Sequence, residues 1–277
     1  NDGKSASDIL ANSHMIFTGP PGTGKTTVAK HFGNVMKNLE LLPKNDVVCV
    51  TGQSLQGAYI GSTGPLVTEV MKKAKGGILF IDEAYGLIPK RGNYGEEAIQ
   101  TLLDNMTRDE FKGNLLIIIA GYENNIEELF TVNPGLRSRL DKCRIAFPKW
   151  TGQQATTATV NAISRDNKTI TESGSKKLLE YYNILENLSD WGSAREVYEV
   201  VLPALYMTRA QRLVNDSKLN PPSNSQNNNN NNPPPYTETD VISVLEPIVL
   251  QRKKLVKKKS NLNNFLQSNR NNLDSDE

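Results

Sequence analysis

Residues 14–27 read HMIFTGPPGTGKTT, a short apolar run followed at once by a glycine-rich loop and by residues that can open a helix. The loop matches the pattern GxxxxGK[ST] in the strand-to-helix position where that pattern binds phosphate. Glycines let backbone N–H groups face a phosphate, and the helix N-terminus adds positive potential. This context disfavours the alternative, a structural glycine-rich turn. We expect a nucleotide site formed by Gly19, Pro20, Pro21, Gly22, Thr23, Gly24, Lys25, Thr26 and Thr27.

A second motif is an apolar run at 78–81 that ends in Asp82 and Glu83. Ligands of open α/β sheets bind where the strands end, so both carboxylates should emerge at that edge. Beside the glycine-rich loop, we expect Lys25 to reach the β and γ phosphates and Thr26 to ligate Mg²⁺. Asp82 would hold Mg²⁺ through water, and Glu83 would orient or deprotonate the attacking water. Two acids alone are also common at solvated strand ends, so this assignment depends on the loop.

Together the two motifs favour hydrolysis of a nucleoside triphosphate over phosphate transfer, because Glu83 recruits the water that a kinase must exclude. A guanine-specific GTPase would need an NKxD-type base reader. The nearest match, at 167–170, lacks the acid. Adenine is therefore the expected base, with ATP and Mg²⁺ as the expected cofactors.

Short apolar runs alternate with helical segments up to residue 147, which is typical of a parallel sheet covered by helices on both faces. The expected strands are His14–Thr18, Asp46–Thr51, Gly77–Ile81, Asn114–Ala120 and Cys143–Phe147. Helices are expected over Glu96–Met106 and Leu66–Lys75, with Pro65 at the first helical position.

After residue 148 the pattern changes to helices only. Apolar residues Val197, Val200, Val201, Ala204 and Leu205 are spaced for one face of a helix. Ser193 and Glu196 form a capping-box pattern that predicts the start of this helix. Farther on, 217–236 is rich in Asn and Pro and is expected to be a linker, and 240–266 could form one helix interrupted by a proline.

The net charge of +2 implies no charge-driven partner for the whole chain. Cys49 and Cys143 are too few for a disulfide framework, so we expect a reducing compartment, cytoplasmic or nuclear. Apolar runs such as Leu115–Ala120 are far shorter than the roughly 18 residues that cross a bilayer, which predicts no membrane insertion. The chain opens with Asn1 and lacks a signal-peptide pattern, which predicts a fragment or a processed chain.

Five segments, in chain order, resemble AAA+ ATPases: GPPGTGKTT, LFIDEAYGL, IAGYENN, NPGLRSR and GSAREV. Within these ATPases, the strings AYIGST, DEAYGL, YGEEAI and NPGLRSR are most similar to the CbxX/CfqX family, which includes the red-type Rubisco activase CbbX. The resemblance covers about residues 13–210. It implies an α/β P-loop NTPase with a five-stranded parallel sheet and a small all-α lid domain. It further implies a homo-oligomeric ring, usually a hexamer, in which ATP hydrolysis drives remodelling of a protein partner.

The changes of pattern and composition along the chain, together with the resemblance, give the expected domains. Residues 1–149 would form the AAA+ nucleotide-binding domain and 150–216 the helical lid. Residues 217–239 would be a disordered linker, and 240–277 a basic tail that is helical or disordered.

Further roles follow from the resemblance residue by residue. Arg137 and Arg139 match the region that supplies the arginine finger to a neighbour's γ-phosphate, and one of them is expected to serve. Arg195 matches the sensor-2 arginine, whereas Tyr59 and Ile60 match the pore loop that grips a threaded polypeptide. The alternatives are surface ion pairs for the two arginines, an exposed helix start for Arg195, and ordinary packing of Tyr59 on its own domain.

Other features leave different functions open. Tyr122 stands where many AAA+ proteins place a sensor-1 Asn or Thr, with Asn124 and Asn125 beyond it. The basic run at 252–259 would suit a nucleic-acid-stimulated motor or loader. The PPxY string at 233–236, which WW domains recognise, would suit a slow nucleotide-gated scaffold. The protein substrate stays unassigned.

Overall fold

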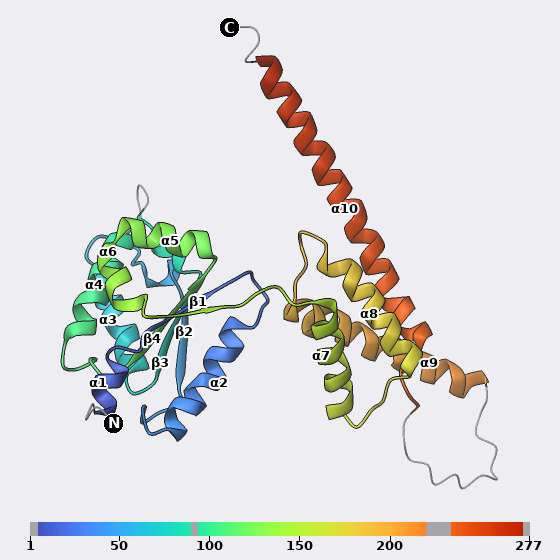
Figure 1. The fold of residues 1–277 in the computed structure, drawn as a ribbon, viewed down its shortest axis with the longest axis horizontal. Helices are drawn as coiled ribbons and strands as arrows, with labels where there is room; N and C mark the ends of the chain where they lie inside the picture. The colour runs from blue at the N-terminus through green and yellow to red at the C-terminus, as the bar shows by residue number, and fades with distance from the viewer. Residues whose placement is uncertain (1–4, 90–93, 220–233, 274–277) are drawn as a thin grey trace. The chain divides into compact units, whose positions relative to one another are not determined.

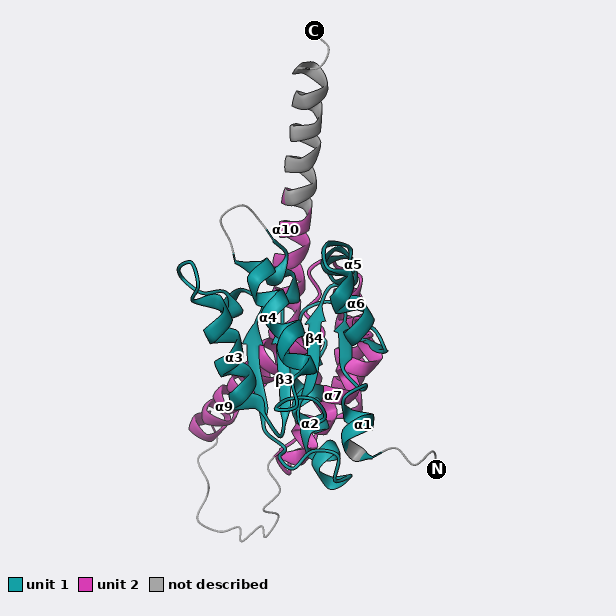
Figure 2. Ribbon diagram, turned by 90° about the vertical axis from the view of Figure 1, so that its left-hand side faces the viewer, with its two compact units in different colours: residues 1–148 teal, residues 149–277 magenta. Residues whose placement is uncertain are grey.

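The computed structural model describes residues 5–89, 94–219 and 234–273 (Figure 1). The chain forms two compact units, residues 1–148 and residues 149–277, which Figure 2 shows in different colours. Each unit has its own hydrophobic core and is described by itself.

One parallel sheet organises the first unit, with strand order β2-β3-β4-β1-β5. The strands are β1 Met15–Thr18, β2 Val47–Thr51, β3 Ile78–Asp82, β4 Leu116–Gly121 and β5 Cys143–Ala146. The predicted fold class is confirmed, and each strand starts within two residues of its expected position. The three inner strands are buried on both faces, whereas the edge strands β2 and β5 are partly exposed because each has one neighbour.

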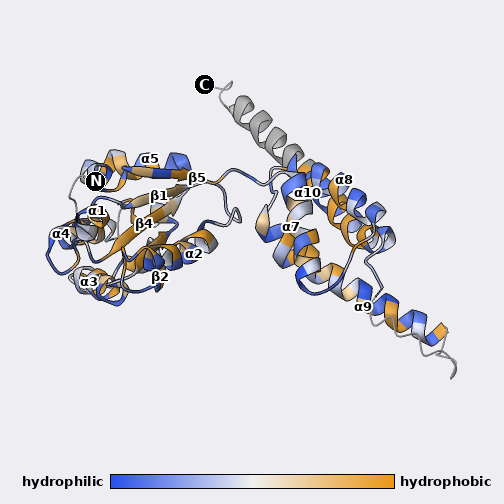
Figure 3. Ribbon diagram, turned by 60° about the horizontal axis from the view of Figure 1, so that its bottom comes forward, coloured by the Kyte–Doolittle hydropathy of each residue, from blue (hydrophilic) through white to orange (hydrophobic). Residues whose placement is uncertain are grey.

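Helices cover both faces of this sheet. They are α1 Ala6–Leu10, α2 Lys25–Asn38, α3 Thr63–Ala74, α4 Gly95–Thr107, α5 Glu123–Val132 and α6 Pro134–Leu140, with 3₁₀ turns at Gln53–Leu55 and Ala84–Leu87. Alternate strand residues such as Phe17 and Phe80 share a core with α1 and α2, and Ile16 and Leu79 share one with α3 to α6. Hydrophobic colouring accordingly concentrates on the strands in Figure 3. Pro65 is the third residue of α3, where its missing N–H has no helical partner to lose.

His14 is buried immediately before β1 and helps to join the sheet. Its Nδ1 accepts a hydrogen bond of 3.1 Å from the N–H of Ile117. Burial, assisted by the positive charge of Lys142, lowers the pKa of His14 to about 4. The folded chain therefore favours the neutral imidazole.

This histidine predicts sensitivity to acid. Its folded pKa lies below the ordinary value, so the stability it supports is present above about pH 6.5 and is lost as the pH falls towards 4, by about 3 kcal/mol in all. The measurement is the unfolding free energy between pH 7.5 and pH 4. His14→Gln keeps an acceptor for the Ile117 N–H but does not titrate, so its stability should fall less steeply. Equal slopes for both chains would refute the assignment.

Where the structure describes the second unit, its regular elements are helices, apart from one isolated bridge between Ile170 and Tyr236. Its elements are α7 Gly152–Arg165, α8 Glu172–Glu186, a π-helix at Glu196–Val201, α9 Leu202–Leu219 and α10 Glu238–Leu273. Tyr182, Trp191 and Leu205 are buried in its core, and α10 packs against α8 and α9 (Figure 1).

The helix expected over 240–266 lies within α10, but the bounds of the expected linker and the separation of the tail from the helical unit differ from what the structure shows. α9 continues to Leu219, and residues 220–233 of the expected linker lie outside the described residues. Tyr236 is only 1% exposed, and its backbone bonds to Thr169 and Thr171 on both sides. Val241 and Leu245 of α10 are also buried in the same core. The segment after the Asn-rich stretch thus completes the core of the helical unit, because its apolar face packs with residues of α7 to α9.

The predicted capping box is wrong. Ser193 has a φ of +53°, whereas a helix N-cap takes an extended conformation. Its Oγ accepts the N–H of Trp150 at 3.1 Å instead, and the carboxylate of Glu196 binds Arg252. The π-helix that follows also shifts the buried face, so Val201 is buried and Val200, expected on the same face, is exposed.

Candidate functional site

The glycine-rich loop joins the end of β1 to the start of α2 at the carboxyl edge of the sheet. Gly24 precedes α2 with a φ of +99°, a conformation that favours glycine. A Cβ at Gly19 would lie 2.1 Å from the carbonyl oxygen of Phe147, so only glycine fits there. The Gly19 N–H donates to the carbonyl of Gly121 on β4 at 3.0 Å, which ties the loop to the sheet.

Lys25 is buried at the first position of α2. Its Nζ donates to the carbonyl oxygens of Gly19 and Pro20, each at 2.8 Å. Thr23 also donates to the carbonyl of Pro20, at 2.9 Å. The ammonium group is therefore held inside the loop that the sequence predicts to bind phosphate.

Thr26 and Asp82 lie together although 56 residues separate them. The Thr26 hydroxyl donates to Asp82 Oδ2 at 3.3 Å, and Asp82 Oδ1 accepts the N–H of Glu83 at 2.9 Å. A hydroxyl and a carboxylate are the hard oxygen ligands that Mg²⁺ takes, and Mg²⁺ needs only one or two carboxylates besides water and phosphate. The pair fits that ion, and the described residues hold no cluster of three or more His, Cys, Asp or Glu side chains that would suit another metal.

Glu83 follows β3 with an exposed side chain and a φ of +48°, an uncommon conformation for a residue with a side chain. Tyr85, two residues on, hydrogen-bonds to its carboxylate. Burial first, and then the charge and hydrogen bond of Glu83, raise the pKa of the Tyr85 phenol. This tyrosine was not predicted from the sequence, although its position within the string DEAYGL is a signal that could have identified it.

Tyr122 follows β4, which lies between β3 and β1 in the sheet. Its phenol is close enough to Tyr85 to contribute to the raised pKa of that residue. Asn124 and Asn125 lie in the first turn of α5, beyond the strand end. This edge of the sheet therefore carries the Tyr85 phenol beside Glu83, with the Tyr122 phenol near Tyr85.

The two arginines of α6 differ in their surroundings. Arg137 forms ion pairs with Glu127 at 2.5 Å and Asp141 at 3.6 Å, and its guanidinium lies over the ring of Phe130. Arg139 donates to the carbonyl of Gly135 at 3.3 Å and forms no ion pair within the described part of the chain. The sequence alone did not separate the two residues.

A third arginine belongs to the same network. Arg144 on β5 forms ion pairs with Glu123, Glu127 and Asp141. Hydrogen bonds from Arg144 and Arg137 lower the pKa of Glu127. This network, which ties Arg137 to α5 and to β5, was not predicted from the sequence.

Tyr59 and Ile60 form the tip of a turn before α3. Their side chains are 70% and 86% exposed, so Tyr59 does not pack on its own unit. Ser62 closes the turn, since its Oγ accepts the N–H of Tyr59 and donates to the Tyr59 carbonyl. Gly61 has a φ of +82°. The turn therefore presents two apolar side chains to solvent.

Arg195 belongs to the helical unit and directly precedes the π-helix. Its side chain is 58% exposed and lies 3.8 Å from the carboxylate of Glu199. Such a surface pair is weak, so the guanidinium can change partners at little cost.

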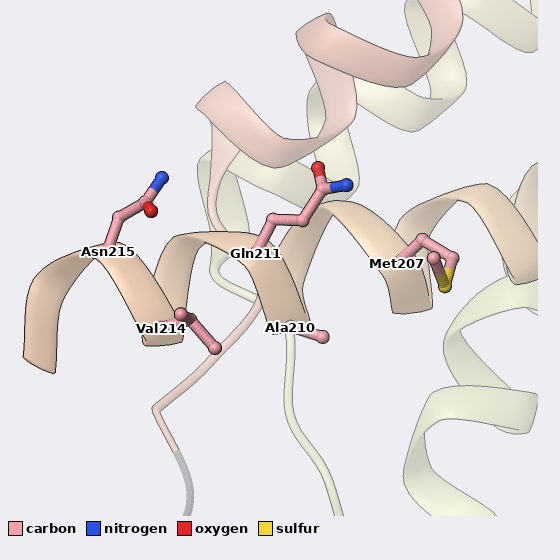
Figure 4. A pocket seen from close by; sticks show the side chains of 5 residues that line it. All are labelled: Met207, Ala210, Gln211, Val214 and Asn215. Carbon is pink, nitrogen blue, oxygen red and sulfur yellow. The ribbon is translucent and has the colours of Figure 1, made fainter.

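Other features offer less. The buried Tyr236 is not available to a WW domain, and Arg252, the first residue of the basic run, is engaged with Asp190 and Glu196. An open depression along α9 carries no charged or nucleophilic side chain (Figure 4) and is lined by Met207, Ala210, Gln211, Val214 and Asn215. Among the described helices, none has the length and apolar character needed to cross a membrane.

Comparison with known proteins places these motifs among relatives. A family model described as "ATPase family associated with various cellular activities (AAA)" matches residues 15–148. The chain is 38% identical to "Protein CfxQ homolog" of Galdieria sulphuraria, over 74% of this chain and 66% of that protein. It is 37% identical to "Protein CbbX" of Cereibacter sphaeroides, over 74% and 65%. It is also 37% identical to "Protein CfxQ homolog" of Guillardia theta, over 73% and 68%.

One solved structure, "Crystal structure of FIGL-1 AAA domain in complex with ADP", superposes with a TM-score of 0.52 over 85% of this chain and 71% of that chain. At 16% identity this likeness concerns the fold alone. The chain spans about two thirds of the length of the three relatives, from 65% to 68%.

Proposed function

This chain belongs to the CfxQ/CbbX family of AAA ATPases, and from that premise we propose that it hydrolyses ATP in a Mg²⁺-dependent reaction that remodels a protein partner. The active form is a ring of like subunits, a hexamer in its usual form. Adenine is the base, as the lack of a guanine reader predicts.

The observation that carries this proposal is the meeting of three features at one edge of the sheet. Lys25 lies in the glycine-rich loop, the Thr26 hydroxyl contacts Asp82, and Glu83 follows directly. On this proposal Lys25 exchanges its two carbonyl partners for phosphate oxygens, and Thr26 with Asp82 holds the ion. Mg²⁺, when bound, offsets negative charge on the phosphates. Glu83 orients the attacking water and accepts its proton.

Two arginines complete the site in this proposal. Arg139 is the finger given to the neighbouring subunit, because no carboxylate among the described residues pairs with it, whereas Arg137 has a structural role in the network with Glu127 and Asp141. Arg195 is the sensor that contacts the γ-phosphate from the lid of the same subunit, and its exposed side chain favours that role.

Tyr59 and Ile60 are proposed to grip the partner. Their exposure supports this role, since an aromatic ring and an aliphatic side chain in solvent can bury themselves against any extended polypeptide. Gly61, with a φ of +82°, adopts the backbone conformation that lets the turn present both side chains.

Tyr59→Ala should therefore uncouple the two activities. Casein, which is an unfolded polypeptide, should raise ATP turnover by the unchanged chain severalfold, and the variant should lose that stimulation while keeping its basal rate. Phosphate release is measured with Mg²⁺, and a chelator gives the baseline. Leu39→Ala, which removes a side chain 62% exposed elsewhere in the same unit, is the matched control. Full stimulation of the Tyr59 variant would exclude this loop as the gripping element.

A further inference from the structure

A tightly built turn leads into Arg195 in the helical unit. Ser193 is fully buried in a left-handed conformation, and its Oγ accepts the N–H of Trp150. Trp191 returns the contact, since its indole Nε1 donates to the Trp150 carbonyl at 2.7 Å. A non-glycine residue at positive φ persists where its surroundings over-determine it. The orientation of Arg195 therefore depends on the contacts that hold the turn at residues 190–196 in place.

Glu196, the residue after Arg195, is a buried carboxylate with a distant partner. It is 2% exposed, and its Oε2 lies 2.5 Å from the guanidinium of Arg252 on α10. Its Oε1 has no hydrogen-bond partner among the described residues. Burial raises the pKa of Glu196, and the charge of Arg252 opposes that shift. The positive charge of Arg252 therefore offsets the cost of burying the Glu196 carboxylate.

The same guanidinium also reaches the opposite end of the turn. One nitrogen of Arg252 donates to the carbonyl of Asp190 at 2.9 Å and lies 3.5 Å from its carboxylate. The planar fork of an arginine suits two acceptors at once, which a single ammonium group cannot match. Arg252 thus bridges Asp190 and Glu196, the two ends of the turn that carries Arg195.

We propose that Arg252 is a positioning residue for ATP turnover, which holds the turn at 190–196 so that Arg195 is presented to the nucleotide. The inference rests on the proposed role of Arg195. It makes α10, which follows the Asn-rich stretch, a control element of the ATPase cycle. Whatever displaces α10 from the lid would then slow hydrolysis without touching the nucleotide.

A double-mutant cycle tests this directly in the full chain. Arg252→Ala should lower kcat by between about 10- and 100-fold, as small misplacements remote from the reacting groups do. Arg195→Ala should lower kcat as well. If Arg252 acts through Arg195, its replacement costs nothing further in the Arg195→Ala background. If the reductions of kcat by the two replacements instead multiply in the double variant, Arg252 only stabilises the lid, and the inference is overturned.

Arg252→Lys keeps the test valid where the alanine variant unfolds. Lysine retains the charge beside Glu196 but loses the second contact, so the thermal midpoint should stay near that of the unchanged chain while kcat falls severalfold. Lys176→Ala, which removes an exposed ion pair with Glu172 in the same unit, is the matched control and should match the unchanged chain. Full turnover by Arg252→Lys would reject a positioning role.

The tryptophans give an independent measurement. The chain has two tryptophans: Trp191 lies in this turn and Trp150 contacts it, so the intrinsic tryptophan emission reports on the turn. Adding ATP should change the emission of the unchanged chain, and Arg252→Lys should reduce that change. An Arg195→Ala chain with full turnover would instead contradict the sensor role of Arg195, and with it the premise. Full turnover by Arg195→Ala thus refutes the role of Arg195, whereas multiplying effects in the double variant refute only the role of Arg252.

Discussion

Glu83→Gln should lower the rate of phosphate release from ATP by about 10²- to 10⁴-fold, the usual contribution of a general base. Glutamine has nearly the same shape but cannot accept a proton, so water is no longer activated. Lys25 and the Thr26–Asp82 pair are untouched, and ATP should bind as tightly as before. The experiment measures retention of labelled ATP and release of phosphate by the same preparation.

Two comparisons make this result specific. Glu69→Gln replaces an exposed acid of the same unit that pairs with Lys73, and its turnover should equal that of the unchanged chain. A chelator should abolish release by every variant if Mg²⁺ is required. If the Glu83 variant turns over ATP within a fewfold of the unchanged chain, Glu83 has no role in the reaction. If the unchanged chain neither binds ATP nor releases phosphate, the proposed function is wrong.

The sequence predicted the first unit well because local pattern and burial agree there. The run at 78–81 is apolar at every position since both faces of β3 are covered, and the strand bounds follow from it. The glycine-rich loop could be predicted equally well, because Gly19 and Gly24 occupy positions where a side chain would clash or strain the backbone. Such constraints act over a few residues and can be recognised without tertiary contacts.

Long-range pairing explains most of what the sequence did not predict. Ser193 and Glu196 have the spacing of a capping box, yet Trp150 and Arg252 take their side chains from positions 43 and 56 residues away. Tyr236 follows a stretch of low complexity, and its burial depends on Tyr206 and Arg209 of α9 and on the bridge to Ile170. Composition describes how a segment behaves alone, whereas burial here comes from surfaces that other helices leave uncovered.

The sequence could not distinguish the roles of the two arginines of α6 for the same reason. Replacing them gives the second large expected effect on ATP turnover. Arg139→Ala should reduce ATP turnover by about 10³- to 10⁵-fold, the usual worth of an arginine finger. Arg137→Ala should cost far less turnover, because Glu127 and Asp141 already hold that guanidinium in its own subunit. Its effect should appear mainly as a lower thermal midpoint. Reversed effects of the two variants would assign the finger to Arg137.

Mixing separates a finger given to a neighbour from one used within the subunit. An Arg139→Ala subunit keeps Glu83, and a Glu83→Gln subunit keeps the finger, so their contact in one orientation rebuilds a complete site. In an equal mixture with random assembly, about a quarter of the contacts are of that kind, because heterologous ring interfaces are directional. Turnover should therefore rise from near zero in either pure variant to about a quarter of the unchanged rate. A mixture as inactive as its components would mean that Arg139 does not act across a subunit boundary.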